Sequence, residues 1–185
     1  NSQLVNENVY AILPDKEGSI LLGTLSALVS FNPEKRSFTT IDKEKDGTPF
    51  TSQRITILFR DSRKRLWIGG EEVFQQEGIE IEKAPILPES SVTKMFTNCI
   101  YEAANGIIWV GTREGFYCFN EKEKKIKRYT TANGLPNNVV YGILEDTFGR
   151  LWVSTNRGIS CFNPETERFR NFTESDGLQS NQFNT

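Results

Sequence analysis

The sequence predicts an all-β protein made of four consecutive four-stranded antiparallel blades of a β-propeller. An apolar anchor recurs at intervals of 46, 42 and 43 residues, at Leu21, Trp67, Trp109 and Trp152. Short strand-forming runs alternate with turns rich in Gly, Asn and Asp, and no segment keeps the 3.6-residue apolar period of an amphipathic helix. A period in the low forties with short strands is typical of one propeller blade.

The fourth repeat shows the strand pattern most clearly. Its turns begin at Asp146, Asn156 and Asn163, whose side chains can hydrogen-bond the nearby backbone. Gly149 and Gly158 can take the positive φ angles that tight turns need. The predicted strands cover 139–145, 151–155, 159–162 and 169–173.

The other repeats follow the same plan with different fidelity. The first crosses to the second at Asp46-Gly47. The second loses its alternation after Gly70, and Pro85 and Pro88 fall within 75–91, so we expect an irregular outer edge there. The chain 1–185 is interpreted as one propeller segment, and its predicted blades cover about 8–50, 51–95, 96–136 and 137–182.

The anchor residues are expected to pack between blades. One blade cannot hide both apolar faces of its sheet, so each face needs a neighbour. Leu21, Trp67, Trp109 and Trp152 are therefore the predicted structural core of the blades, with the weakest seam at Leu21. The alternative role of a tryptophan, a stacking platform for a sugar, needs an exposed ring, whereas these side chains share one strand position between apolar neighbours.

Composition and charge exclude several classes of site. The 22 basic and 24 acidic residues give a net charge of −2, which argues against a nucleic-acid surface. The chain has no histidine, which excludes His-based triads and zinc sites of the His type. Asp15, Asp61 and Asp146 occupy matching turns, so turn chemistry explains them better than paired acid–base catalysis. We predict no catalytic residues, metal or cofactor in this segment.

The remaining reactive and charged groups have structural interpretations. The basic run 122–128 alternates with glutamates and reads as a solvated hairpin. Cys99, Cys118 and Cys161 lie in apolar runs and are expected to be small buried hydrophobes. A Cys118–Cys161 bridge is the less favoured alternative, because the two occupy matching places in successive repeats. The chain shows no signal peptide and no apolar run of the roughly 20 residues that span a bilayer, and it opens in mid-pattern, so we expect it to belong to a longer protein.

The pattern of the fourth repeat is similar to that of a known family. From Val140 the chain reads V-x-x-I-x-E-D-x-x-G-x-L-W-V-x-T-x-x-G-I-x-x-F-N-P, followed from Phe169 by F-x-x-F-T-x-x-D-G-L-x-S-N-x-F-N. This resembles the two-component regulator propeller repeat, found in periplasmic sensor regions of hybrid histidine kinases of Bacteroides and its relatives. The resemblance covers essentially the whole chain, with the second repeat as the poorest match.

The resemblance implies a function in signal transduction. Similar proteins carry two propellers of usually seven blades, an immunoglobulin-like domain, a membrane helix and a kinase, and they sense oligosaccharides to control polysaccharide utilisation. This chain would then be a partial propeller in the periplasm, with the remaining blades and the immunoglobulin-like domain as partners, and with the membrane reached only through its parent protein. We expect no direct nucleic-acid contact, and a homodimer formed through exposed blade faces.

Two other function classes stay open. A protein–protein scaffold of the WD40 kind would lack a small-molecule ligand, but the Gly-His and Trp-Asp signatures of WD40 repeats are absent from the blades. A propeller lyase or hydrolase is disfavoured by the lack of histidine and of a recurring acid pair. Both alternatives share the predicted fold, so the fold alone does not separate them.

Candidate ligand-binding residues lie on one predicted rim of the blades. On that rim gather the turns between second and third strands and the crossings from one blade to the next. Amides there can hydrogen-bond sugar hydroxyls, and arginines can pair with sulfate or carboxylate groups. The simpler interpretation of any one of them is a solvated loop residue. The candidates are Arg113, Glu114, Asn137, Asn138, Asn156, Arg157 and Asn181.

Overall fold

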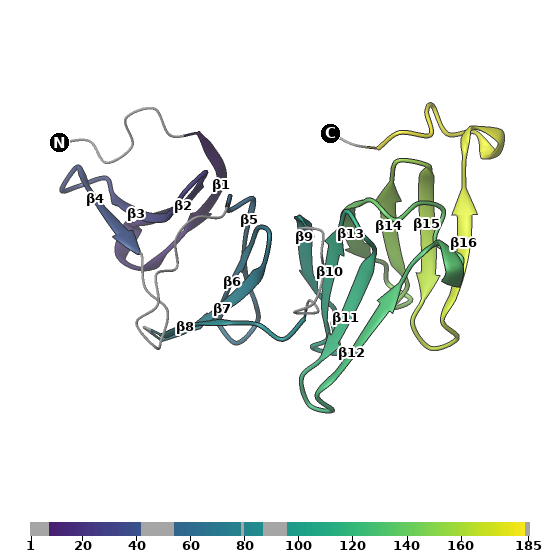
Figure 1. Ribbon diagram of the computed structural model, residues 1–185, viewed down its shortest axis with the longest axis horizontal. Coiled ribbons are helices and arrows are strands. Elements are labelled where there is room, and N and C mark those ends of the chain that lie inside the picture. The colour runs from purple at the N-terminus through teal and green to yellow at the C-terminus, as the bar shows by residue number, and fades with distance from the viewer. Residues whose placement is uncertain (1–7, 42–53, 79, 87–95, 184–185) are drawn as a thin grey trace. The chain divides into compact units, whose positions relative to one another are not determined.

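The described residues fold into four antiparallel sheets of four strands each (Figure 1). The computed structural model describes residues 8–41, 54–78, 80–86 and 96–183. Strands adjacent in the sequence pair with each other in every sheet, which is the plan of a propeller blade. The predicted all-β fold of four-stranded antiparallel blades is confirmed. The chain divides into two compact units, Asn1–Pro85 and Ile86–Thr185, and each holds two blades.

Unit 1 contains blades 1 and 2. The strands of blade 1 are β1 (Val9–Pro14), β2 (Ile20–Thr24), β3 (Leu28–Asn32) and β4 (Ser37–Ile41), and those of blade 2 are β5 (Ile57–Arg60), β6 (Leu66–Gly69), β7 (Val73–Glu77) and β8 (Glu80–Lys83). Leu21 and Leu28 of blade 1 are buried in one cluster with Leu66, Ile68 and Phe74 of blade 2. The anchor Leu21 thus lies in the seam between these blades.

The outer half of blade 2 is more regular than its sequence predicts. β7 and β8 pair in continuous register from Phe74 opposite Lys83 to Glu77 opposite Glu80. The turn is possible because Gly78 takes a φ of 65°, and Ile81 is buried and so fixes the register. The prediction of an irregular outer edge is therefore wrong for the residues up to Lys83. Residues 87–91 of that region, and the predicted crossing at Asp46-Gly47, lie outside the described residues.

Unit 2 contains blades 3 and 4. The strands of blade 3 are β9 (Thr97–Glu102), β10 (Ile108–Thr112), β11 (Phe116–Asn120) and β12 (Lys125–Tyr129), and those of blade 4 are β13 (Val140–Glu145), β14 (Leu151–Thr155), β15 (Gly158–Asn163) and β16 (Arg168–Phe172). In the seam between them the Trp109 ring stacks on Phe116 at 4.7 Å and meets the edge of Phe162 at 5.6 Å. Leu151 and Val153 of blade 4 complete the same buried cluster.

A glycine near the end of the second strand lets the following blade approach closely. A Cβ atom on Gly111 would lie 2.5 Å from a methyl carbon of Val140, and one on Gly23 would lie 2.6 Å from a methyl carbon of Ile55. A side chain at either position would clash with the next blade. This glycine, two residues after the anchor in the same strand, is thus a packing requirement of the seam.

Helical structure in the described ranges is confined to three single turns. These 3₁₀ turns cover Lys16–Gly18, Thr131–Asn133 and Glu174–Asp176. None of the helices described is long and apolar enough to cross a membrane. The latter two turns follow β12 and β16 and open the crossing out of their blades, so they bear on the rim described next.

Candidate functional site: the rim of blades 3 and 4

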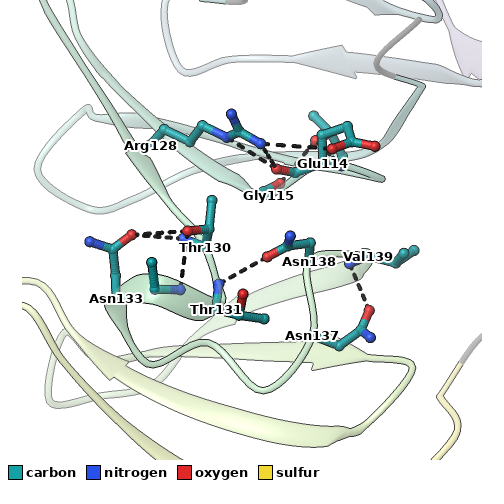
Figure 2. Close-up of polar contacts among 11 residues, drawn as sticks. Glu114, Gly115, Arg128, Thr130, Thr131, Asn133, Asn137, Asn138 and Val139 are labelled. Atoms are coloured by element: carbon teal, nitrogen blue, oxygen red, sulfur yellow. Dashed lines mark hydrogen bonds and ion pairs between the residues drawn. The ribbon is translucent and has the colours of Figure 1, made fainter. Parts of the chain in front are cut away.

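The rim is the end of unit 2 at which β10, β12, β14 and β16 finish. Because neighbouring strands are antiparallel, the β10–β11 and β14–β15 turns lie at this end together with the two segments that leave β12 and β16. All seven residues predicted to bind ligand stand in these turns and segments. Figure 2 shows part of the blade 3 rim.

The crossing from blade 3 to blade 4 is held by asparagine side chains. Thr130 caps the 3₁₀ turn, and its backbone N–H donates to the Asn133 amide oxygen at 2.9 Å. The Asn138 amide oxygen accepts from the Thr131 N–H at 2.9 Å, and the Asn137 amide oxygen accepts from the Val139 N–H at 2.9 Å (Figure 2). Asn137 and Asn138 therefore shape the backbone with their oxygen atoms, as short polar side chains do in turns.

The same device recurs 43 residues later in blade 4. The Asn181 amide oxygen accepts from the Glu174 N–H at 2.9 Å, and its own backbone N–H donates to the Glu174 carboxylate at 3.2 Å. The Asn181 carbonyl also accepts from the Gly158 N–H at 2.6 Å. Asn181 is thus attached to the β14–β15 turn that carries Asn156 and Arg157, and the structure brings these three candidates together.

The β10–β11 turn presents charged side chains of both signs. The Glu114 carbonyl accepts from Nε of Arg128 at 3.1 Å and also from its Nη2 atom, and the carboxylate of Glu114 lies 3.8 Å from that Nη2 (Figure 2). The Arg113 guanidinium lies 4.6 Å from the centre of the Phe96 ring, a cation–π contact. Arg113 and Arg157 are both exposed, so their guanidinium groups face solvent.

Arg128 and a repeated threonine were missed by the sequence interpretation. Arg128 belongs to the run read as a solvated hairpin, but it lies opposite Tyr117 near the rim end of β12. Thr112 and Thr155 are fully buried at the ends of β10 and β14, and each hydroxyl donates to the glycine carbonyl three residues on, at 3.0 and 2.9 Å. The recurrence of Thr-x-x-Gly in the repeats was the available signal for these turns.

The opposite ends of the blades carry a second repeated network, centred on aspartate. Asp61 accepts from the N–H of Arg63 and Arg65 through one oxygen, and from Arg65 Nε at 2.7 Å and Trp67 Nε1 at 3.0 Å through the other. Burial raises the pKa of this carboxyl, but the bonds from Trp67 and Arg65 outweigh it and hold the pKa below its usual value. With its acceptor sites occupied, Asp61 is a structural group.

Blade 4 repeats the aspartate network in a more open setting. Asp146 accepts from Trp152 Nε1 at 2.9 Å and from Arg150 Nε at 2.8 Å. Burial again raises the pKa of the carboxyl, and the bonds from Trp152, Arg150 and the Phe148 N–H lower it to about 2. Asp15 differs, because it forms an ion pair with Arg60 of blade 2 at 2.7 Å.

The cysteines offer no reactive or metal-binding group in the described ranges. Cys99, Cys118 and Cys161 are free thiols there. Burial raises the pKa of the Cys99 thiol to about 12 and that of Cys118 to about 11, so both are protonated at neutral pH. The described residues also contain no group of three His, Cys, Asp or Glu side chains that could hold a metal ion.

The fold and the rim define a repeat protein of β-propeller blades whose turns are built from polar side chains. The sequence profile of the two component regulator propeller matches residues 49–72, 90–114 and 134–157, and each match contains the first two strands of one blade. Three of the four blades are thus two-component regulator propeller repeats.

Individual proteins are similar to this chain in sequence or in fold. Histidine kinase P4 of Formosa agariphila is 30% identical over 155 residues, which cover 78% of this chain and 11% of the kinase. The extracellular domain of a hybrid two component system from B. thetaiotaomicron matches with a TM-score of 0.72 and 19% identity, over 91% of this chain and 23% of that one. The chain therefore spans only a small part of these relatives.

A second group of solved structures shares the fold but is named for an enzyme. Virginiamycin B lyase from Staphylococcus aureus, with quinupristin, matches with a TM-score of 0.69 and 18% identity, over 93% of this chain and 57% of the lyase. At this identity the likeness concerns the fold. That lyase structure is of a catalytically inactive variant in which a histidine is replaced by alanine, whereas the present chain contains no histidine.

Proposed function

We propose that this chain is part of the extracytoplasmic sensor region of a hybrid two-component histidine kinase, and that it recognises oligosaccharides at the rim of its blades. The observation that carries the proposal is the presence of two-component regulator propeller repeats, together with the match to part of a histidine kinase. The likeness to extracellular domains of two component systems supports a place outside the cytoplasm.

The chemistry of the rim supports an oligosaccharide ligand. The amide oxygens of Asn138 and Asn181 are used by the backbone, which fixes these side chains and leaves their NH₂ groups to donate to hydroxyls. Arg157 and Arg113 add exposed guanidinium groups, which can pair with carboxylate or sulfate groups of acidic sugars. Amides held in place by the backbone, together with exposed cations, are suited to a polar ligand with some anionic groups.

Signalling would follow from binding at the rim. A ligand that contacts both the β14–β15 turn and the segment after β16 would link Arg157 to Asn181. The two segments are already joined, because the Gly158 N–H donates to the Asn181 carbonyl. Any difference in ligand affinity between two arrangements of the blades would then shift their populations. The remaining blades and an immunoglobulin-like domain of the parent protein are the proposed route to the kinase.

Calorimetric titration of the chain with a panel of neutral and acidic oligosaccharides tests the proposal. We expect at least one glycan to bind, and Arg157→Ala to weaken an acidic ligand by about tenfold, the effect of one charge-assisted contact. Arg168→Ala is the matched control, because Arg168 is an exposed arginine at the opposite end of blade 4. Silence across the whole panel, or an equal loss with Arg168→Ala, would count against rim binding.

A further inference from the structure

The turn between the first two strands of a blade, which we call the first turn, carries the aspartate network. Its full form needs three side chains at positions i, i+4 and i+6: an aspartate, an arginine and the tryptophan anchor. In this form the carboxylate accepts from the arginine Nε and from the indole Nε1 of the same blade. Of the four blades only blades 2 and 4 have all three residues, which are Asp61, Arg65 and Trp67 in one and Asp146, Arg150 and Trp152 in the other.

Blade 1 has the aspartate but not the arginine. Ser19 takes the arginine position and Leu21 that of the tryptophan. The Oδ1 atom of Asp15 accepts instead from Nη2 of Arg60 at 2.7 Å, and Arg60 is the last residue of β5 in blade 2. Nη1 of the same guanidinium donates to the Lys64 carbonyl at 3.1 Å, so the group is held between the two first turns. The cation that blade 1 lacks therefore comes from the next blade.

Blade 3 has neither the aspartate nor the arginine, and Ala103 and Ile107 take their positions. Here the next blade supplies a carboxylate from Glu145, the last residue of β13. Its Oε2 atom accepts from the Ala104 N–H in the first turn of blade 3 at 2.8 Å, and from the Tyr101 hydroxyl at 3.5 Å. In blades 2 and 4 the aspartate itself accepts from the backbone of this turn. The carboxylate that blade 3 lacks therefore also comes from the next blade.

Arg60 and Glu145 stand at equivalent positions, because the shift of 85 residues that converts Trp67 into Trp152 also converts one into the other. They carry opposite charges, and each supplies the kind of group that the preceding blade lacks. We propose that the blades are built as pairs, blade 1 with blade 2 and blade 3 with blade 4, in which the second blade completes the first turn of the first blade. The second blade of each pair has the full aspartate network of its own. These pairs coincide with the two compact units of the chain.

The pairing is a conformational device with a direction. Displacement of the second blade removes the charged partner from the first turn of the first blade, whereas the first turn of the second blade keeps its own aspartate, arginine and tryptophan. A shift of blade 4 would leave the Ala104 N–H without its acceptor, and a shift of blade 2 would leave Asp15 without its cation. The network lies at the end of the blades opposite the rim, so the inference does not rest on the proposed glycan binding.

Native-state hydrogen exchange of the full chain tests the pair of blades 1 and 2. The Asp15 N–H donates to the Ser19 carbonyl at 2.8 Å, so exchange at this amide reports opening of the first turn of blade 1. Arg60→Met removes the guanidinium but keeps an apolar side chain in its place, so the variant should keep the far-ultraviolet circular dichroism of the parent. We expect exchange at the Asp15 amide to become about fivefold to tenfold faster, the effect of one charge-assisted contact.

A substitution within blade 1 should remove its dependence on blade 2. In a Ser19→Arg background the arginine position of blade 1 is filled as it is in blades 2 and 4. Arg60→Met should then leave exchange at the Asp15 amide unchanged. Ser19→Gln is the matched control, because it adds a long polar side chain without a charge, and in this background Arg60→Met should still speed the exchange.

Glu145→Ala tests the pair of blades 3 and 4 by the same measurement. The Ala103 N–H donates to the Ile107 carbonyl at 2.9 Å and reports the first turn of blade 3. We expect exchange at this amide to become about fivefold to tenfold faster. The Asp146 N–H, which donates to the Arg150 carbonyl at 2.9 Å, reports the first turn of blade 4 and should not change.

Three results would overturn the proposal. If Glu145→Ala speeds exchange in the first turns of both blades alike, the dependence has no direction. If Arg60→Met leaves the Asp15 amide unchanged, blade 2 does not complete the turn of blade 1. If Ser19→Gln protects that amide as well as Ser19→Arg does, the missing group is not a cation.

Discussion

At the scale of the residue, the indole nitrogen of the repeated tryptophan finds a partner in some blades and not in others. Trp67 donates to Asp61 in blade 2, and Trp152 donates to Asp146 in blade 4. In blade 3 the equivalent of the aspartate is Ala103, and Trp109 Nε1 is buried without a partner among the described residues. The two fully buried tryptophans, Trp67 and Trp109, therefore differ in whether the indole N–H has a hydrogen-bond acceptor.

This difference predicts unequal effects of phenylalanine at the two sites. Trp67→Phe removes the indole N–H from a buried, charged aspartate, whereas Trp109→Phe removes a donor that has no acceptor. We expect Trp67→Phe to lower the free energy of unfolding by about 1.5–3 kcal/mol more than Trp109→Phe, the worth of a hydrogen bond to a charged group. Chemical denaturation of both variants measures this. Equal losses would show that only ring volume matters at the anchor.

At the scale of the element, the turns between third and fourth strands in blades 1, 3 and 4 share a strained residue. Arg36, Lys124 and Glu167 occupy matching positions and have φ angles of 50°, 52° and 55°. An asparagine at the start of each turn, such as Asn120, accepts from a backbone N–H three residues on. The asparagine stabilises the turn by this hydrogen bond, and the residue with the positive φ angle is the one whose backbone is strained.

Lys124→Gly should relieve that strain. A left-handed backbone conformation costs a residue with a side chain roughly 1–2 kcal/mol, and glycine avoids this cost. Part of the gain is offset, because glycine loses more conformational entropy on folding than lysine does. We expect a gain in the free energy of unfolding of about 0.5–1 kcal/mol, measured by urea denaturation. Lys122→Gly, in the same turn but without a positive φ, should instead destabilise the protein slightly. A loss with Lys124→Gly would contradict the assignment of strain.

The strands could be predicted from the sequence where the repeat was strong, but the hydrogen bonds made by individual side chains could not. The spacing of Trp109 and Trp152 sufficed for the four-strand plan, because period and turn residues are local in the sequence. The ordered hairpin of β7 and β8 was missed, since its register depends on burial of Ile81 by the neighbouring blade 1. The rim position of Asn138 followed from the repeat, but its bond to the Thr131 N–H depends on a backbone path that the sequence does not display.

At the scale of the whole molecule, the seam decides whether two blades unfold together. The Phe162 ring belongs to blade 4 but lies within 6 Å of Trp109, Phe116 and Tyr129 of blade 3. In stacked repeats much of the stability resides in such nearest-neighbour contacts, so neither blade of unit 2 is expected to be stable without the other.

Phe162→Ala tests this coupling. The fully buried ring leaves a cavity in the shared core, so we expect a loss of about 3–5 kcal/mol in the free energy of unfolding of unit 2. Native-state hydrogen exchange should show the slowest amides of β10 in blade 3 losing protection by the same free energy as those of β14 in blade 4, because both report one cooperative opening. Phe148→Ala, on an exposed turn of the same blade, should change neither set. Loss of protection in β14 alone would mean that the blades open independently and that the seam does not couple them.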